Sequence, residues 1–257
     1  MTTDPARPLN EHLNEVRSRI IKSVVLVVAV IFILMPCSDT LLQAMLWPLH
    51  AYGNTLGSQG RIVFTEPAEA FMVNWNLAIY ASIFISSPFI LYQIWAFVAI
   101  ALRPHEKRKF LAAFFVSAFL FTLGSAFGFL AVIPVALMFL LGFASDLMVP
   151  MLSIGKYVSF VSVMSLVFGL VFQLPLVMVF LTRLGILSPA YLAGKRRAII
   201  VIIFIIAAIF TPNDGLTMFL MAIPLLLLFE AGLFFSRLTK PRMVATDNPP
   251  ADSNKPV

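Results

Sequence analysis

The segment from Phe110 to Phe139 reads FLAAFFVSAFLFTLGSAFGFLAVIPVALMF and contains no charged residue. An α-helix needs about 20 consecutive apolar residues to cross the hydrocarbon core of a bilayer, and this segment is long enough. Further apolar segments of the same character occur before and after this one in the chain. The sequence therefore predicts an all-α membrane protein with six transmembrane helices. The predicted spans are residues 20–35, 71–101, 110–139, 157–181, 198–210 and 216–235.

The composition supports a membrane protein and excludes several other classes. Apolar residues make up 60% of the chain and charged residues 12%, with a mean hydropathy of +0.96. A soluble domain of this length could not bury so many apolar residues in a single core. The single cysteine, Cys37, excludes an internal disulfide and a thiolate metal cluster, and no cofactor is expected. The net charge of +6 does not indicate nucleic-acid binding, because the basic residues lie in short clusters between apolar segments.

The distribution of Lys and Arg predicts the orientation in the membrane. If the amino terminus is cytoplasmic, 16 of the 18 Lys and Arg residues face the cytoplasm, and only Arg61 and Lys156 lie outside. Such a bias is typical of the cytoplasmic loops of membrane proteins. We therefore expect a multi-pass protein of the bacterial inner membrane with both termini in the cytoplasm.

The segments outside the spans have their own signatures. Residues 1–19 are predicted to form a cytoplasmic amphipathic helix, because apolar side chains recur there at helical spacing, as at Leu13, Val16 and Ile20. Acidic residues in this region argue against a cleavable signal peptide. Residues 39–49 resemble an amphipathic helix on the outer surface. Residues 239–257 are predicted to be a disordered cytoplasmic tail.

The later spans predict a curved bundle. The span 198–210 gives about 20 Å of helix against about 30 Å of hydrocarbon, and Glu230 interrupts the last span. We therefore expect the last two helices to be short and the bilayer beside them to be thinned. Four prolines within the spans are expected to kink the helices and to frame a concave face. These prolines are Pro88, Pro134, Pro175 and Pro224.

Six short motifs follow one another along this predicted topology. They are HLNEVRSR at 12–19, EPAEAF at 66–71, PFILYQIWAF at 88–97, HEKR at 105–108, FG with FQLP between 168 and 175, and TPND at 211–214. In order and spacing they resemble the TatC subunits of the twin-arginine protein translocase, over nearly the whole chain up to Leu238. The sequence departs from that pattern where a Pro is expected at Ile100, a Tyr at Phe129 and a second Pro at Asn213. Some relatives carry Glu at the position of Gln173.

The resemblance implies a binding protein and not an enzyme. It implies that the chain is the core receptor for twin-arginine signal peptides of folded precursors. Such a receptor assembles with TatA-type and TatB-type single-span subunits, in several copies, for export driven by the proton gradient. Two carboxylates, Glu15 and Glu106, are the candidates for binding the arginine pair, because the predicted cytoplasmic face is otherwise basic and would repel it. A guanidinium pairs with a carboxylate through two parallel hydrogen bonds, which the ammonium of lysine does not reproduce.

The resemblance also implies supporting residues. For the signal peptide these are His12, Arg17, Arg19 and Phe97, and for partner subunits they are Pro48, Gln173 and Asp214.

Local interpretations of the same residues remain open. Glu15 could simply pair with Arg19 at i, i+4, and Glu106 with Arg108 or Lys109. Gln173 is interpreted either as a docking point for a partner helix or as an interhelical hydrogen bond within the bundle.

Three further polar groups carry a structural expectation. Gln93 and Glu230 also lie within spans, where polar side chains are costly, and Glu230 is expected to reach the membrane interface. The carboxylates Glu66, Glu69 and Asp214 are expected to cap helix starts.

Two other functional classes of membrane protein fit the sequence less well than a receptor. A small-solute secondary transporter is the alternative, but broken helices in two matching halves and ionisable groups at the midplane are absent from the sequence. A membrane-embedded hydrolase is disfavoured, because no Ser, His and Asp set converges and no HExxH motif occurs.

Overall fold

The computed structural model is a bundle of long helices, and it describes residues 9–53, 61–63, 65–100, 107–142, 151–210 and 215–239. The elements, in chain order, are α1 (Leu9–Leu34), η1 (Met35–Cys37), α2 (Ser38–Gly53), β1 (Arg61–Val63), α3 (Glu69–Ile100), α4 (Lys107–Phe127), η3 (Gly128–Val132), α5 (Ile133–Gly142), β2 (Met151–Ser153), α6 (Ile154–Val171), α7 (Leu174–Arg183), α8 (Pro189–Gly194), α9 (Arg196–Phe210) and α10 (Gly215–Leu238).

Five helical segments of the described chain are long and apolar enough to cross a membrane. They are 13–49, 69–98, 111–140, 154–183 and 217–238, and the shorter α9 corresponds to the remaining predicted span. The all-α membrane architecture is therefore confirmed. The last helix is longer than expected, since α10 has 24 residues and continues through Glu230. The other predicted short helix, α9, has 15 residues.

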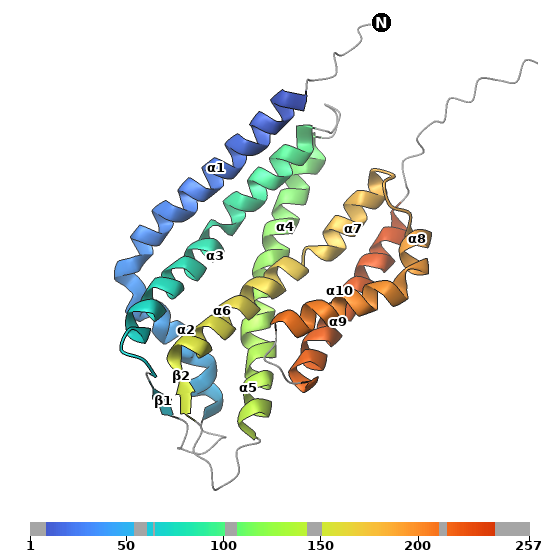
Figure 1. Ribbon diagram of the computed structural model, residues 1–257. Coiled ribbons are helices and arrows are strands. Elements are labelled where there is room, and N and C mark those ends of the chain that lie inside the picture. The colour runs from blue at the N-terminus through green and yellow to red at the C-terminus, as the bar shows by residue number, and fades with distance from the viewer. Residues whose placement is uncertain are drawn as a thin grey trace, which may run out of the picture.

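Helix α6 is the centre of the packing. It contacts α3 on one side and α4 on the other, while α10 packs against α7 and α9 (Figure 1). Its side chains Val161, Met164 and Phe168 are at most 1% exposed. Helix α1 packs along α3 and has no buried residue in its membrane-spanning part. In its predicted apolar stripe, Leu13 and Ile20 are exposed and Val16 is partly exposed, so the stripe does not enter the bundle core.

Two prolines mark breaks in helices. Pro175 lies at the start of α7, directly after the interruption at Phe172 and Gln173 that separates α7 from α6. Pro134 follows the π-helical turn η3, which joins α4 to α5. A proline cannot donate its backbone nitrogen and its ring clashes with the carbonyl four residues earlier, so the preceding turn is displaced. Helices α3 and α10 continue through Pro88 and Pro224.

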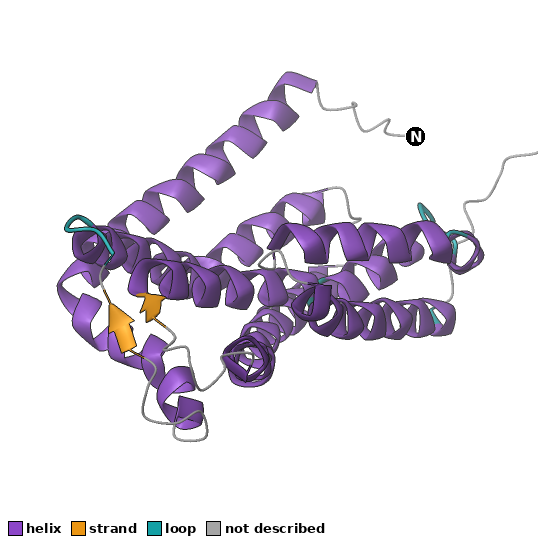
Figure 2. Ribbon diagram, turned by 60° about the horizontal axis from the view of Figure 1, so that its bottom comes forward, coloured by secondary structure: helices purple, strands orange, loops and turns teal. Residues whose placement is uncertain are grey.

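A small parallel sheet closes the end of the bundle opposite the start of α1. Strands β1 and β2 pair in register from Arg61 with Met151 to Val63 with Ser153 (Figure 2). The sequence did not predict this sheet. Helix α2 lies beside the same end (Figure 1) and extends the predicted outer-surface helix to Gly53.

The tail predicted to be disordered, from residue 240 onward, lies outside the described residues.

Candidate functional site

Basic residues gather at one end of the bundle. This basic end is where α1 begins, α3 ends, α4 begins and α10 ends (Figure 1). The Lys and Arg of the described chain that belong to it are Arg17, Arg19, Lys22, Lys107, Arg108, Lys109, Arg183, Lys195, Arg196, Arg197 and Arg237. Within the same part of the chain, only Arg61 in β1 and Lys156 in α6 lie at the opposite end, which we call the strand end.

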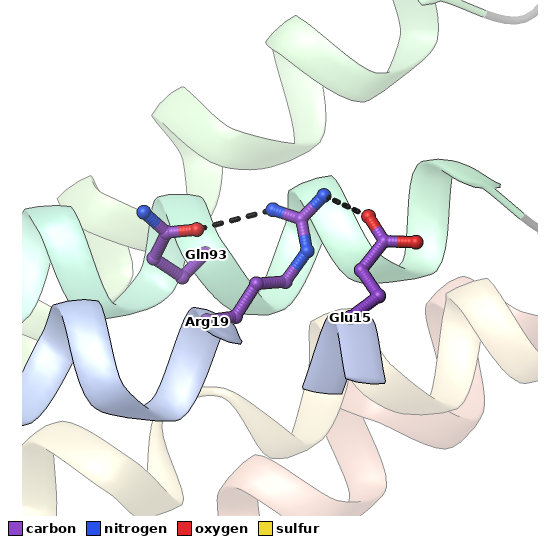
Figure 3. A network of polar contacts seen from close by, with 3 residues as sticks. All are labelled: Glu15, Arg19 and Gln93. Atoms are coloured by element: carbon purple, nitrogen blue, oxygen red, sulfur yellow. Dashed lines mark hydrogen bonds and ion pairs between the residues drawn. The ribbon is translucent and has the colours of Figure 1, made fainter. Parts of the chain in front are cut away.

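A polar network joins α1 to α3 near the basic end. The Nη2 of Arg19 donates to Oε1 of Glu15 at 2.7 Å, and Nη1 of Arg19 donates to Oε1 of Gln93 at 3.1 Å. Figure 3 shows the guanidinium lying between the two acceptors. Glu15 and Arg19 are one turn apart on α1, a spacing that brings side chains onto the same face of a helix. The network therefore fixes the rotation of α1 against α3.

Burial makes this network more than a surface ion pair. The side chain of Arg19 is 20% exposed and that of Glu15 is 30% exposed, while Gln93 is buried. The Nε of Arg19 is also buried and has no hydrogen-bond partner. A charged group in such a place is stabilised only through its partners. An acidic group is thus presented, partly desolvated, on an otherwise basic surface.

The i, i+4 pair of Glu15 with Arg19 was one of the interpretations left open by the sequence, and it is present. The contact from Arg19 to Gln93 was not predicted, although Gln93 was recognised as a polar group within a span. A signal was available: a lone amide within a span needs a partner. The identity of that partner depends on which face of α1 meets α3, and helical periodicity alone does not define that.

The structure describes the other predicted peptide-binding residues only in part. Arg17 is exposed on α1, and Phe97 is partly buried on α3, one turn after Gln93 and so on the same face. His12 lies on α1, and its side chain is outside the description. Glu106 also lies outside the described residues, directly before the first residue of α4.

The structure describes two of the three residues predicted to contact partner subunits. Gln173 is buried at the break between α6 and α7 and exchanges two hydrogen bonds with Ser117 of α4. Ser117 donates its hydroxyl to Oε1 of Gln173 at 2.6 Å, and Nε2 of Gln173 donates to the Ser117 carbonyl at 3.0 Å. The interhelical hydrogen bond left open by the sequence is therefore present. Pro48 is buried within α2, and Asp214 lies outside the described residues.

The strand end is held by Glu69, the first residue of α3. Its Oε1 accepts from the backbone N–H of Gly155 at 2.8 Å and from the hydroxyl of Ser153, and its Oε2 accepts from the hydroxyl of Thr65 at 2.8 Å. Gly155 lies in the first turn of α6, so one carboxylate satisfies an orphan donor of a second helix. The capping role expected of Glu69 is thus present and joins two helices. The side chain of Glu66 is exposed.

Near the basic end, Glu230 of α10 pairs with Arg196 at 3.0 Å. Both side chains are about half exposed, at 52% and 43%, as expected for a carboxylate that reaches the interface. Within the described part of the chain, no three His, Cys, Asp or Glu residues are grouped so that they could hold a metal ion.

Known proteins resemble this chain over most of its length. Residues 11–224 match the family model described as Sec-independent protein translocase protein (TatC). The Sec-independent protein translocase protein TatC of Carboxydothermus hydrogenoformans is 39% identical over 240 residues, which covers 93% of this chain and 96% of that protein. The TatC of Escherichia coli strain K12 is 34% identical over 237 residues, covering 92% of this chain and 91% of that protein.

The fold is similar to a solved structure as well. A crystal structure described as the twin-arginine translocase receptor TatC superposes with a TM-score of 0.81 and is 36% identical, covering 89% of this chain and 99% of the crystallised one. Sequence and fold thus agree, and the chain belongs to the TatC family of Sec-independent protein translocase proteins.

Proposed function

We propose that this protein is the receptor subunit that binds twin-arginine signal peptides at its basic end, through the carboxylates of Glu15 and Glu106. The observation that carries the proposal is the position of Glu15. It is a partly desolvated carboxylate on a surface otherwise rich in Lys and Arg, and it already accepts a guanidinium. Protein translocation is the role of the family; the peptide contact is our inference from this geometry.

The basic end would face the cytoplasm, where precursors are made. Both termini would then be cytoplasmic in a bacterial inner membrane, in keeping with the positive-inside rule. Glu106 directly precedes α4 in the connection from α3, and α3 packs against both α1 and α4. Both carboxylates therefore belong to neighbouring helix ends, and one short peptide could engage the two. His12, Arg17 and Phe97 would complete the site around the Glu15–Arg19 pair, and the chain would act by binding, without covalent catalysis.

The direct test is photocrosslinking of the purified protein in nanodiscs to a twin-arginine signal peptide. Replacing Glu15 or Glu106 by Gln removes the charge and keeps the size. A lost charge-assisted hydrogen bond corresponds to a loss of affinity of about tenfold or more at each position. Asp39→Asn, an exposed acid at the strand end, is the matched control and should leave crosslinking unchanged. Unchanged crosslinking in both Glu15→Gln and Glu106→Gln would refute the proposal.

We further propose that TatA-type and TatB-type single-span subunits bind this receptor, in several copies, for export driven by the proton gradient. Gln173, Pro48 and Asp214 are the proposed contacts. Polar side chains at membrane depth are rare and can bind a polar group on a partner helix. For Gln173 this requires that its side-chain amide gives up the hydrogen bonds to Ser117 and forms hydrogen bonds to the partner helix instead. Copurification of partner subunits with Gln173→Leu tests this, and unchanged recovery would exclude Gln173 as a contact.

A further inference from the structure

Arg19 pairs with Glu15 through a guanidinium, the same group that a twin-arginine signal peptide would bring. Its guanidinium donates to Glu15 at 2.7 Å through Nη2 (Figure 3). Among the residues that the structure describes, Arg19 is the sole polar partner of the Glu15 carboxylate, and it donates a hydrogen bond to Oε1 alone. An arginine bound in the bidentate manner uses both carboxylate oxygens. An incoming arginine that binds both oxygens of Glu15 must therefore displace Arg19 from Oε1.

The other contacts of Arg19 allow it to withdraw. Its Nη1 donates at 3.1 Å to Gln93, which lies on α3 and not on the helix of Glu15. Arg19 therefore keeps an acceptor when the Glu15 bond is lost. Its Nε is buried and has no hydrogen-bond partner, so its present position leaves one donor unsatisfied, which is unfavourable. The ion pair is thus easier to displace than a fully bonded one.

We propose that Arg19 is an internal competitor for Glu15: the first arginine of a signal peptide displaces it from the carboxylate, and Gln93 retains it. The inference rests on the proposed function and specifies what a ligand of the same site must displace. A ligand must bind Glu15 better than a tethered guanidinium does. A lysine ammonium lacks the planar pair of donors, so it replaces the guanidinium of Arg19 less well than an arginine does.

The test is the affinity of fluorescent signal peptides with Arg-Arg or Lys-Lys for the full-length protein in nanodiscs. In Arg19→Gln the competitor is gone, so Arg-Arg and Lys-Lys peptides should both bind about two- to tenfold more tightly. Lys22→Gln is the matched control, because it removes the same charge from an exposed position one turn further along α1. If Arg19→Gln binds no more tightly than Lys22→Gln, or more weakly, the proposal is overturned.

A second variant covers the case in which Arg19→Gln does not assemble. Arg19→Lys keeps the charge, but one ammonium is a poorer match for two acceptors on different helices. It should also bind Arg-Arg peptide more tightly than the wild type. Equal or weaker binding would overturn the proposal.

Variants of Gln93 provide an independent test of the proposal. Gln93→Met should weaken Arg-Arg binding severalfold in the wild-type background, because displaced Arg19 then lacks an acceptor. The same change should have no effect in Arg19→Gln. An equal loss in both backgrounds would mean that Gln93 contacts the peptide itself, which overturns its assigned role. Loss of binding in Glu15→Gln together with weakened binding in Arg19→Gln would reject the competitor and leave the proposed function intact.

Discussion

At the scale of single residues, two buried glutamines within the apolar bundle are paired across helices. Gln173 with Ser117 joins the α6–α7 break to α4, and Gln93 with Arg19 joins α3 to α1. Water is absent from the hydrocarbon core, so such groups must find partners in the protein. Each pair therefore specifies which helix faces meet.

Ser117→Ala should lower the stability of the protein in detergent by about 0.6 kcal/mol, and at most about 1.7 kcal/mol, the range measured for interhelical hydrogen bonds in a membrane. The Oε1 of Gln173 would lose its hydroxyl donor, while the bond to the Ser117 carbonyl would remain. Chemical unfolding followed by circular dichroism measures the change. Thr122→Ala is the control on the same helix, because the hydroxyl of Thr122 is exposed and bonds only to its own helix at Ala118. Equal effects of the two variants would contradict the assignment.

At the scale of elements, close contact between α4 and α6 depends on small residues. A Cβ placed at Gly124 would lie 2.5 Å from the Phe172 ring and 2.7 Å from the carbonyl oxygen of Phe168. Small residues let helix backbones approach each other in membranes, where dispersion contacts replace the hydrophobic effect as the driving force. The Phe168–Gly169 motif noted in the sequence lies on the other side of the same contact.

Gly124→Ala is therefore expected to destabilise the protein by about 1–3 kcal/mol, the usual consequence of overpacking. The neighbouring atoms include backbone, which cannot rotate away, so α4 and α6 must separate. Thermal unfolding of the detergent-solubilised protein measures this. Gly142→Ala, at the end of α5 with no atom within 4 Å of the added methyl group, should leave the midpoint unchanged. A Gly124→Ala midpoint like that of Gly142→Ala would show that the contact is looser than the structure indicates.

At the scale of the whole molecule, the two ends differ in character. The strand end is closed by the β1–β2 pair and by Glu69, which connects the start of α3 to the start of α6. The basic end carries the Glu15 network and most of the cationic residues. The contacts of Glu69 and of the two strands lie away from the surface at which we propose the peptide binds, so the partners of Glu15 can change without disturbing the strand end.

Glu69→Gln should loosen the strand end and leave peptide affinity unchanged. A neutral amide interacts less favourably with the positive end of the α6 dipole, so amide hydrogen exchange at Gly155 and along 61–63 should accelerate. Hydrogen exchange with mass spectrometry measures this. Glu66→Gln, a change at an exposed side chain on the same turn, is the control. Unchanged exchange in Glu69→Gln would show that the contacts of the Glu69 carboxylate are not needed to hold the strand end together.

The bilayer should be thinner beside α9 than beside α3. Helix α9 has 15 residues, or about 22 Å at 1.5 Å per residue, against about 30 Å of hydrocarbon. Spin labels placed along α9 and along α3 in liposomes, read by accessibility to oxygen and to a polar relaxant, would map the depth. An apolar belt of full thickness along α9 would contradict the prediction.

The sequence alone indicates a helical membrane protein and a resemblance to one family along most of the chain. Apolar length and motif order are local properties of the chain, so they are readable without a structure. Glu15 stands out as a candidate in the same way, because acids are few on the predicted basic face. The first predicted span, 20–35, is shorter than the apolar helical segment 13–49 of the structure. The length of α10 was underestimated, because Glu230 was expected to interrupt a helix that continues past it and pairs with Arg196.

Which polar groups meet depends on the tertiary fold. The contacts of Gln93 with Arg19, of Gln173 with Ser117 and of Glu69 with Gly155 join residues 74, 56 and 86 positions apart. The parallel strands that close the strand end are equally remote in sequence. Such pairings depend on the rotation of each helix about its axis and on the spacing between helices. Packing of whole faces sets both quantities, and a periodic pattern in one segment does not contain them.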